Sequence, residues 1–129
     1  MANAGILDIR SHHSVPKTLD RLEALAQARG LLVFARIDFS GDAQRAGLSL
    51  RPMQMLLFGN PEAGTPLLQA APRVGLDLPL KALAWEDADG TVWVSMNTPT
   101  HLGERHDLAP GLLGNLAPGR VLVEAAAGE

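Results

Sequence analysis

Two strand-like segments joined by an Asp-Gly turn constrain the fold of this chain more than any other feature. Residues 81–86 and 91–96 are rich in apolar side chains, and Asp89-Gly90 lies in the short connection between them. Glycine accepts a positive φ without a steric penalty, so this pair is a strong signal for an antiparallel β-hairpin. The hairpin favours an α+β fold over a doubly wound parallel sheet.

One amphipathic helix and three apolar runs account for most of the chain before the hairpin. Residues 16–29 repeat leucine and alanine at three- and four-residue spacing, with charged side chains on the outer face, which predicts a helix. The runs that predict strands are residues 6–10, 31–37 and 53–58. The run at 31–37 is nearly continuous, which is typical of a buried strand.

Short helices are predicted around the remaining Pro and Gly positions. Residues 66–71 are expected to form one, with Thr65 as its N-cap and Pro66 in the first position. A second is expected at residues 99–105, and broken helical pieces at about 110–127. The whole is expected to be a single α+β domain over residues 1–129, with a mainly antiparallel sheet and helices packed on it.

The composition excludes several classes of function. The formal net charge is −3 and basic residues do not cluster, so nucleic-acid binding is not expected. Cysteine is absent, which removes disulfides, thiolate nucleophiles and Cys-based zinc sites. No apolar run reaches the ~18 residues of a membrane span, and the first residues do not resemble a signal peptide. We therefore expect a cytoplasmic protein that does not bind membranes.

The loop after the third predicted strand, Phe58-Gly59-Asn60-Pro61-Glu62-Ala63-Gly64-Thr65-Pro66, is the main candidate binding site. Its Gly, Asn and Pro residues suit a tight turn, and turn geometry alone is a sufficient reason for them. A helix beginning at Pro66 would also present free backbone N–H groups, which favour a carboxylate or phosphate. The sequence lacks the Gly-Lys-Ser/Thr ending of a P-loop.

Segments Leu57-Phe58-Gly59-Asn60-Pro61 and Gly64-Thr65-Pro66-Leu67 resemble the signature of domain-of-unknown-function family 302. The resemblance extends over about residues 6–108. The other segments that carry it are residues 18–22, 33–38, 47–52, 77–81, 85–87 and 102–106.

The resemblance implies a compact α+β domain with an antiparallel sheet, often dimeric, and it implies no general activity. This chain departs from common patterns of the family. Phe39 and Met96 stand where many relatives have His and Tyr, and Gly59 and Leu80 where another branch has Cys. A thiol, redox or metal role suggested for those relatives is therefore not carried over, and no cofactor or metal is expected.

Two groups of titratable residues are candidates for chemistry. Asp38 ends a predicted strand, where it serves as the first-choice acidic residue or simply caps the next turn. His101 and Glu104 share one helix face, and Arg105 and His106 follow them, but the metal-binding His-Glu-x-x-His pattern is absent. A surface helix with an ion pair explains this second group without any ligand.

Three functions remain open from the sequence. The leading hypothesis is non-catalytic binding of a small molecule or anion by a homodimer. The residues expected to contact the ligand are Asp38, Asn60, Gly64, Thr65, Arg105 and His106, with Arg51 as another possible counter-charge. The alternatives are an enzyme that uses Asp38 with His101 or His106 as acid–base groups, and a structural or interaction module whose interface is formed by the two Trp residues and the C-terminal Leu-rich segment.

Overall fold

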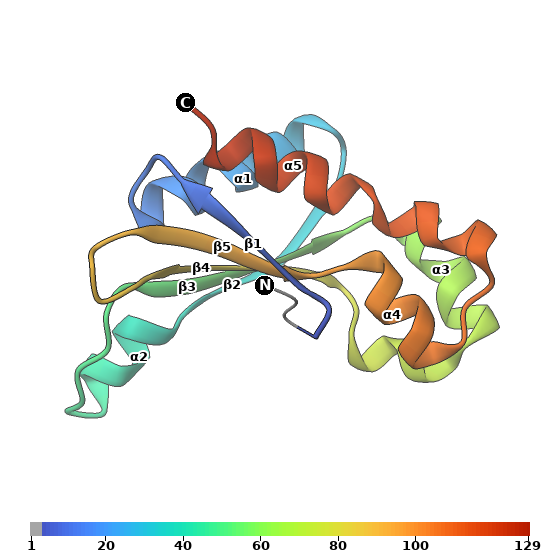
Figure 1. Cartoon of the computed structure of the whole chain (residues 1–129), viewed down its shortest axis with the longest axis horizontal. Helices are drawn as coiled ribbons and strands as arrows, with labels where there is room; N and C mark the ends of the chain where they lie inside the picture. Colours follow the sequence, from blue (N-terminus) through green and yellow to red (C-terminus); the bar gives the residue numbers. More distant parts are fainter. Residues whose placement is uncertain (1–3) are drawn as a thin grey trace.

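A five-stranded antiparallel sheet in the order β1-β5-β4-β3-β2 organises the computed structural model, which describes residues 4–129 (Figure 1). Its strands are β1 (Ile6–Ser11), β2 (Leu32–Asp38), β3 (Met53–Gly59), β4 (Leu80–Glu86) and β5 (Val92–Asn97). The helices are α1 (Val15–Ala28), α2 (Phe39–Arg45), α3 (Pro61–Ala70), η1 (Pro72–Leu76), α4 (Pro99–His106), η2 (Pro110–Leu116) and α5 (Pro118–Ala127). The predicted α+β class is confirmed.

The hairpin forms where the Asp-Gly turn predicts it. Trp85 lies opposite Trp93 in the antiparallel β4–β5 pair, and Gly90 has a φ of 81°. Asp87 also stabilises the turn, because its carboxylate accepts hydrogen bonds from the Asp89 and Thr91 backbone N–H groups, both at 2.9 Å.

Helices α1 and α5 cover one face of the sheet and build the main core (Figure 1). Because side chains alternate along a strand, every second strand residue points toward these helices. The fully buried residues of this core include Leu19 and Leu22 of α1, Phe58 of β3 and Leu122 of α5. Burying each such side chain contributes about 1.5–3 kcal/mol relative to leaving it exposed.

Among the described residues, no helix lies over the centre of the opposite face of the sheet (Figure 1). We call this the open face; it carries Met55, Leu57, Leu83, Trp85 and Trp93, all half-buried. In β5, Trp93 thus lies on the open face, whereas Val92, Val94 and Met96 are buried in the main core.

Strand β2 differs from its prediction as a buried strand. It is the edge strand of the sheet, and Leu32 and Phe34 are 48% and 54% exposed. A bulge between Val33 and Ala35 shifts its register against β3. An apolar run indicates strand formation through local preference, but the position of a strand in a sheet depends on pairing with distant segments.

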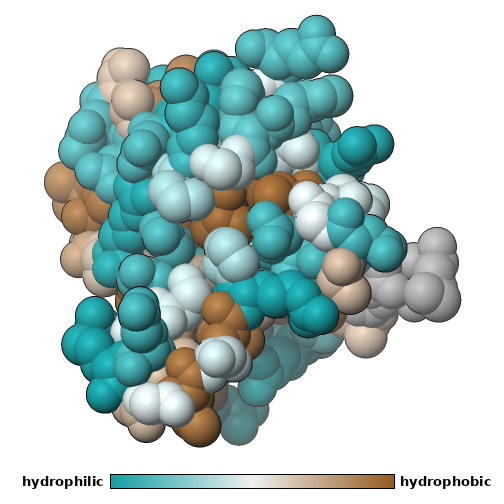
Figure 2. Space-filling view, turned by 90° about the vertical axis from the view of Figure 1, so that its left-hand side faces the viewer, coloured by the Kyte–Doolittle hydropathy of each residue, from teal (hydrophilic) through white to brown (hydrophobic). Residues whose placement is uncertain are grey.

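The two ends of the sheet are different. Helices α3 and α4 gather at one end with η1 and η2, around a second core; its buried residues are Leu67, Val74, Leu102, Leu108 and Leu116. Helix α2 lies at the other end of the sheet, and Figure 2 views the molecule from that end. Hydrophilic residues cover the upper part of this surface, and apolar residues reach it in the middle and at the lower edge. In the described part of the chain, no helix combines the length and hydropathy of a membrane span.

Candidate functional site

Asn60 begins helix α3 directly at the end of β3. Its backbone is extended, and its Oδ1 accepts a hydrogen bond from the Glu62 backbone N–H at 2.9 Å, as an N-cap does. Pro61 occupies the start of the helix, where a missing N–H costs nothing. The prediction of a helix from Pro66 capped by Thr65 is therefore wrong: the earlier Asn-Pro pair starts the helix, and Thr65 and Pro66 lie inside it.

This shift changes what the loop offers to a ligand. The first turn of α3 begins at Pro61 rather than at Pro66, and its N–H groups are already bonded: Glu62 donates to Asn60 Oδ1, and Ala63 and Gly64 donate to the Asn60 carbonyl. Gly59 ends a strand and Gly64 is helical, and neither has a positive φ. The two glycines are therefore not required by turn geometry, and Gly64 instead borders open space: a Cβ added there meets no atom within 4 Å.

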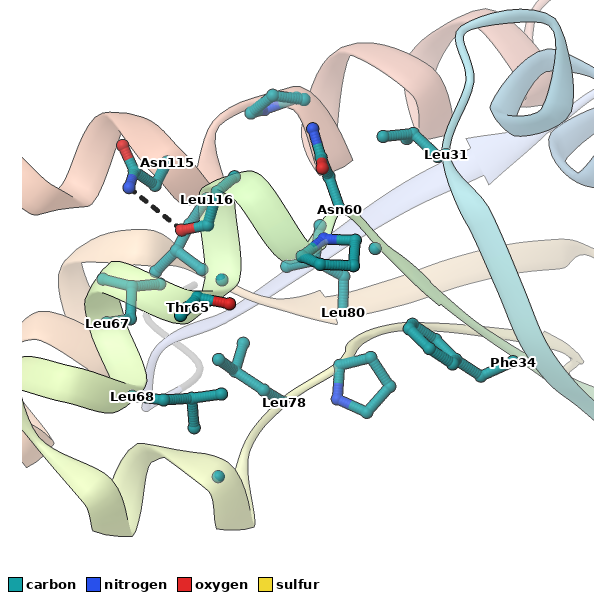
Figure 3. Close-up of a pocket in the computed structure, with 17 residues that line it drawn as sticks. Leu31, Phe34, Asn60, Thr65, Leu67, Leu68, Leu78, Leu80, Asn115 and Leu116 are labelled. Carbon is teal, nitrogen blue, oxygen red and sulfur yellow. Dashed lines mark hydrogen bonds between the residues drawn. The ribbon is translucent and has the colours of Figure 1, made fainter.

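A cavity of about 370 Å³ lies beside α3, between this helix, β2, the η1–β4 segment and η2 (Figure 3). We call it the α3 cavity. Its large apolar lining residues are Leu31, Leu67, Leu68, Leu78, Leu80, Leu116, Pro61, Pro79, Pro118 and Phe34. None of the 17 residues that line it is ionisable. The cavity is therefore apolar and uncharged at its walls.

Three polar side chains line the α3 cavity. Asn60 is engaged as the helix cap, and Asn115 Nδ2 donates to the Ala63 carbonyl at 3.0 Å, which joins η2 to α3. The Thr65 hydroxyl points into the cavity (Figure 3). Thr65 is an exposed residue, and its hydroxyl makes no hydrogen bond within residues 4–129, although helical threonines commonly bond the preceding turn.

Arg105 and His106 do not line this cavity; both bind Asp77. Arg105 donates to the Asp77 carboxylate oxygens at 3.0 Å each, and His106 Nε2 lies 2.5 Å from Oδ2. Burial raises the pKa of Asp77, but the His106 hydrogen bond and the Arg105 charge outweigh it, so the pKa lies below its ordinary value. Arg105 and His106, both expected at the ligand, are thus engaged with Asp77 within the protein.

Lys81 completes this cluster from strand β4. Its Nζ donates to the Pro79 carbonyl at 3.1 Å. Burial lowers the pKa of Lys81, and the Asp77 carboxylate partly restores it. The cluster therefore connects α4 with the segment that forms one wall of the α3 cavity.

Asp38 lies at the other end of the molecule. Leu32 pairs with Gly59 while Asp38 pairs with Gln54, so Asp38 lies at the opposite end of β2, roughly 20 Å from Leu32. It is not among the residues that line the α3 cavity. It caps α2, accepting from the Gly41 N–H at 2.9 Å and the Ser40 hydroxyl at 2.8 Å. These bonds lower the pKa of Asp38.

Asp38 therefore does not meet the histidines of α4. His101 packs at the N-terminal turn, where its ring occupies the space that a side chain on Gly5 would need. His106 is bound to Asp77. The arrangement that the enzyme hypothesis requires, an acid and a base in one cavity, is not formed by these residues.

Three of the residues predicted from the sequence, Asn60, Gly64 and Thr65, line the α3 cavity. Most of the other lining residues were not predicted. Phe34 and Asn115 join the cavity from distant segments, and no local pattern marks them. The contact of Asp77 with Arg105 and His106 of α4 was also not predicted, although Asp77 is the first residue of the segment 77–81 that carries the family resemblance.

The comparisons agree with the fold. The family model described as "Domain of unknown function DUF302" matches residues 7–126. A crystal structure of an uncharacterized conserved protein DUF302 from Bacillus stearothermophilus has a TM-score of 0.78, with 24% identity and coverage of 95% of each chain. The two proteins therefore share a fold, and nothing further is inferred from this likeness.

Curated relatives carry a more specific name. The chain is 44% identical over 115 residues to "Fluoride-specific ion channel FluC 1" of Brucella suis biovar 1 (strain 1330) and to the protein of the same name of Brucella abortus biovar 1 (strain 9-941). The matches cover 89% of this chain, but 44% and 42% of those proteins. The chain thus spans less than half the length of these relatives.

Proposed function

This chain belongs to the DUF302 family of domains of unknown function, and from that premise we propose that it binds a small molecule, without catalysis, in the α3 cavity. The observation that carries the proposal is the cavity itself. Its volume of about 370 Å³ falls in the range of ligand sites, and such sites are mostly apolar with a few polar groups.

The construction of the walls supports binding to a preformed site. Pro61, Pro79 and Pro118 contribute rigid rings, and Asn115 holds η2 against α3 through its bond to Ala63. A site that is already ordered loses little conformational entropy when a ligand enters.

The chemistry of the lining supports a neutral ligand better than an anion. Of the expected counter-charges, Arg105 is bound to Asp77, and Arg51 is not among the residues that line the cavity. An anion placed in the cavity would lose its hydration without gaining a cationic partner. Proton transfer is likewise unsupported there, because no lining residue is titratable.

Thermal-shift measurements test the proposal, using a library of small neutral compounds with phosphates and carboxylates included. Gly64→Leu should block the cavity while improving helix propensity, since Gly64 borders open space. Gln69→Leu on the exposed side of α3 is the matched control, because it adds the same side chain outside the cavity. We expect compounds that stabilise the wild type and Gln69→Leu but not Gly64→Leu. No stabilising compound, or an equal response of Gly64→Leu, would contradict the proposal.

The name of the Brucella relatives adds fluoride as a compound to test. The α3 cavity lacks a cationic lining residue, so its chemistry does not favour a small, strongly hydrated anion. We therefore do not extend the proposal to fluoride. Sodium fluoride, with sodium chloride as the ionic-strength control, belongs in the same thermal-shift series; stabilisation by fluoride alone would redirect the proposal toward that ion.

We further propose that the chain works as a homodimer through the open face. Trp85 Nε1 donates to the Ser95 hydroxyl at 2.7 Å, and Trp93 Nε1 donates to Asp87 at 2.9 Å. Because the polar atoms of both indoles are satisfied internally, the exposed parts of the rings are apolar. The apolar residues of this face are flanked in the register by Asp8, Arg10 and Lys81. A half-exposed apolar patch with a charged rim suits a self-complementary contact about a two-fold axis.

A further inference from the structure

We infer that the ligand of the α3 cavity is a neutral, mainly hydrocarbon molecule with a single hydroxyl or carbonyl group, which hydrogen-bonds Thr65. The inference rests on the proposed function, since it names the chemical class of the molecule bound there. It follows from which atoms of the lining are free to interact.

Each of the two lining amides uses one of its polar atoms within the protein, whereas the Thr65 hydroxyl uses none. Asn60 Oδ1 is used by the Glu62 N–H, and Asn115 Nδ2 by the Ala63 carbonyl. The Thr65 hydroxyl points toward the space bordered by Leu78, Leu80 and Phe34 (Figure 3). It makes no hydrogen bond within residues 4–129. A hydroxyl both donates and accepts, so it pairs with either a ligand hydroxyl or a ligand carbonyl.

The other lining residues indicate the chemistry of the rest of the ligand. They are leucine, proline, glycine and alanine surfaces, with Phe34 at the edge. Phe34 is 54% exposed, and a ligand ring stacked against it would cover that surface. A charged group would be desolvated without a partner, so the class is neutral.

The volume of the α3 cavity limits the size of the ligand. An apolar cavity of about 150 Å³ accommodates benzene. The α3 cavity has about 370 Å³, which leaves room for a two-ring compound or a hydrocarbon of comparable bulk.

Three matched probes test the inference: naphthalene, 2-naphthol and 2-naphthoate, with dissociation constants measured by calorimetry or ligand fluorescence. They share one ring system and differ in lacking a polar group, carrying a neutral hydroxyl, or carrying a carboxylate. We expect 2-naphthol to bind about fivefold more tightly than naphthalene, the effect of one net hydrogen bond, and 2-naphthoate to bind most weakly.

The variant Thr65→Val identifies the group responsible, because valine keeps the shape of threonine and removes its hydroxyl. It should abolish the preference for 2-naphthol over naphthalene. Thr65→Ser retains a hydroxyl and should keep the preference.

The possible outcomes separate this inference from the proposed function. If 2-naphthoate binds as tightly as 2-naphthol, or if Thr65→Val leaves the preference intact, the inferred ligand class is wrong although the cavity still binds. If none of the probes binds, or if Gly64→Leu binds them as the wild type does, binding in the α3 cavity itself is contradicted.

Discussion

His106 Nε2 lies 2.5 Å from Asp77 Oδ2, and the two side chains are only 7% and 14% exposed. This contact joins the last turn of α4 to the residue that follows η1, across 29 positions in the chain. Since Leu78 and Pro79 follow Asp77 and line the α3 cavity, the contact also holds one cavity wall in place.

Removing the Asp77 carboxylate should therefore destabilise the fold. Asp77→Asn weakens bonds to His106 and Arg105, and we expect a loss of about 2 kcal/mol in unfolding free energy, roughly 8 °C in melting temperature. Glu104→Gln is the control, because Glu104 is an exposed α4 residue outside the Asp77 cluster. Equal melting temperatures of the two variants would contradict a stabilising role of the cluster.

The stability that Asp77 provides should depend on pH in the acid range. Its pKa is lowered in the folded protein, so the unfolded chain takes up a proton at a higher pH than the folded chain does. The contribution is full above the unfolded pKa of about 4 and is lost as pH falls through the lower, folded pKa. Denaturation curves should show the difference between wild type and Asp77→Asn shrinking below about pH 4. A difference that grows there would refute this assignment.

Two glycine-to-alanine substitutions should act in opposite directions. Gly64 is helical and an added Cβ meets open space, so Gly64→Ala should stabilise the protein by about 0.5–1 kcal/mol. A Cβ on Gly103 of α4 would lie 2.6 Å from Leu113 Cδ2, so Gly103→Ala should lower the melting temperature. Thermal unfolding followed by circular dichroism measures both; stabilisation by Gly103→Ala would mean that Leu113 moves aside freely.

A charge on the open face should separate the proposed homodimer. Met55 lies between Leu83 and Ile37 in the sheet register, away from the main core, so Met55→Lys places an ammonium group at the interface. Light scattering over a wide concentration range should show a dimer for the wild type and a folded monomer for the variant, with Gln69→Lys as the control. A wild type that stays monomeric throughout would rule out this dimer.

The sequence by itself determined the elements whose signals are local. The Asp89-Gly90 turn predicted the hairpin because positive φ is a property of single residues, and the leucine spacing of residues 16–29 predicted α1 because amphipathic periodicity is local too. Together with the segments around Asn60-Pro61, they also indicated the fold class and the family.

Tertiary structure decided what depends on distant pairing. It made β2 an edge strand rather than a buried one, because strand order depends on pairing with β3 and not on the run's own apolarity. It brought Phe34, Thr65 and Asn115 to one cavity, and it joined Asp77 to His106. The residues brought together lie 29 positions apart for Asp77 and His106, 31 for Phe34 and Thr65, and 50 for Thr65 and Asn115, so no periodicity within one element reveals these contacts. The loop residues near Asn60 were thus recognisable in advance, whereas the neutral cavity that they border exists only in the folded chain.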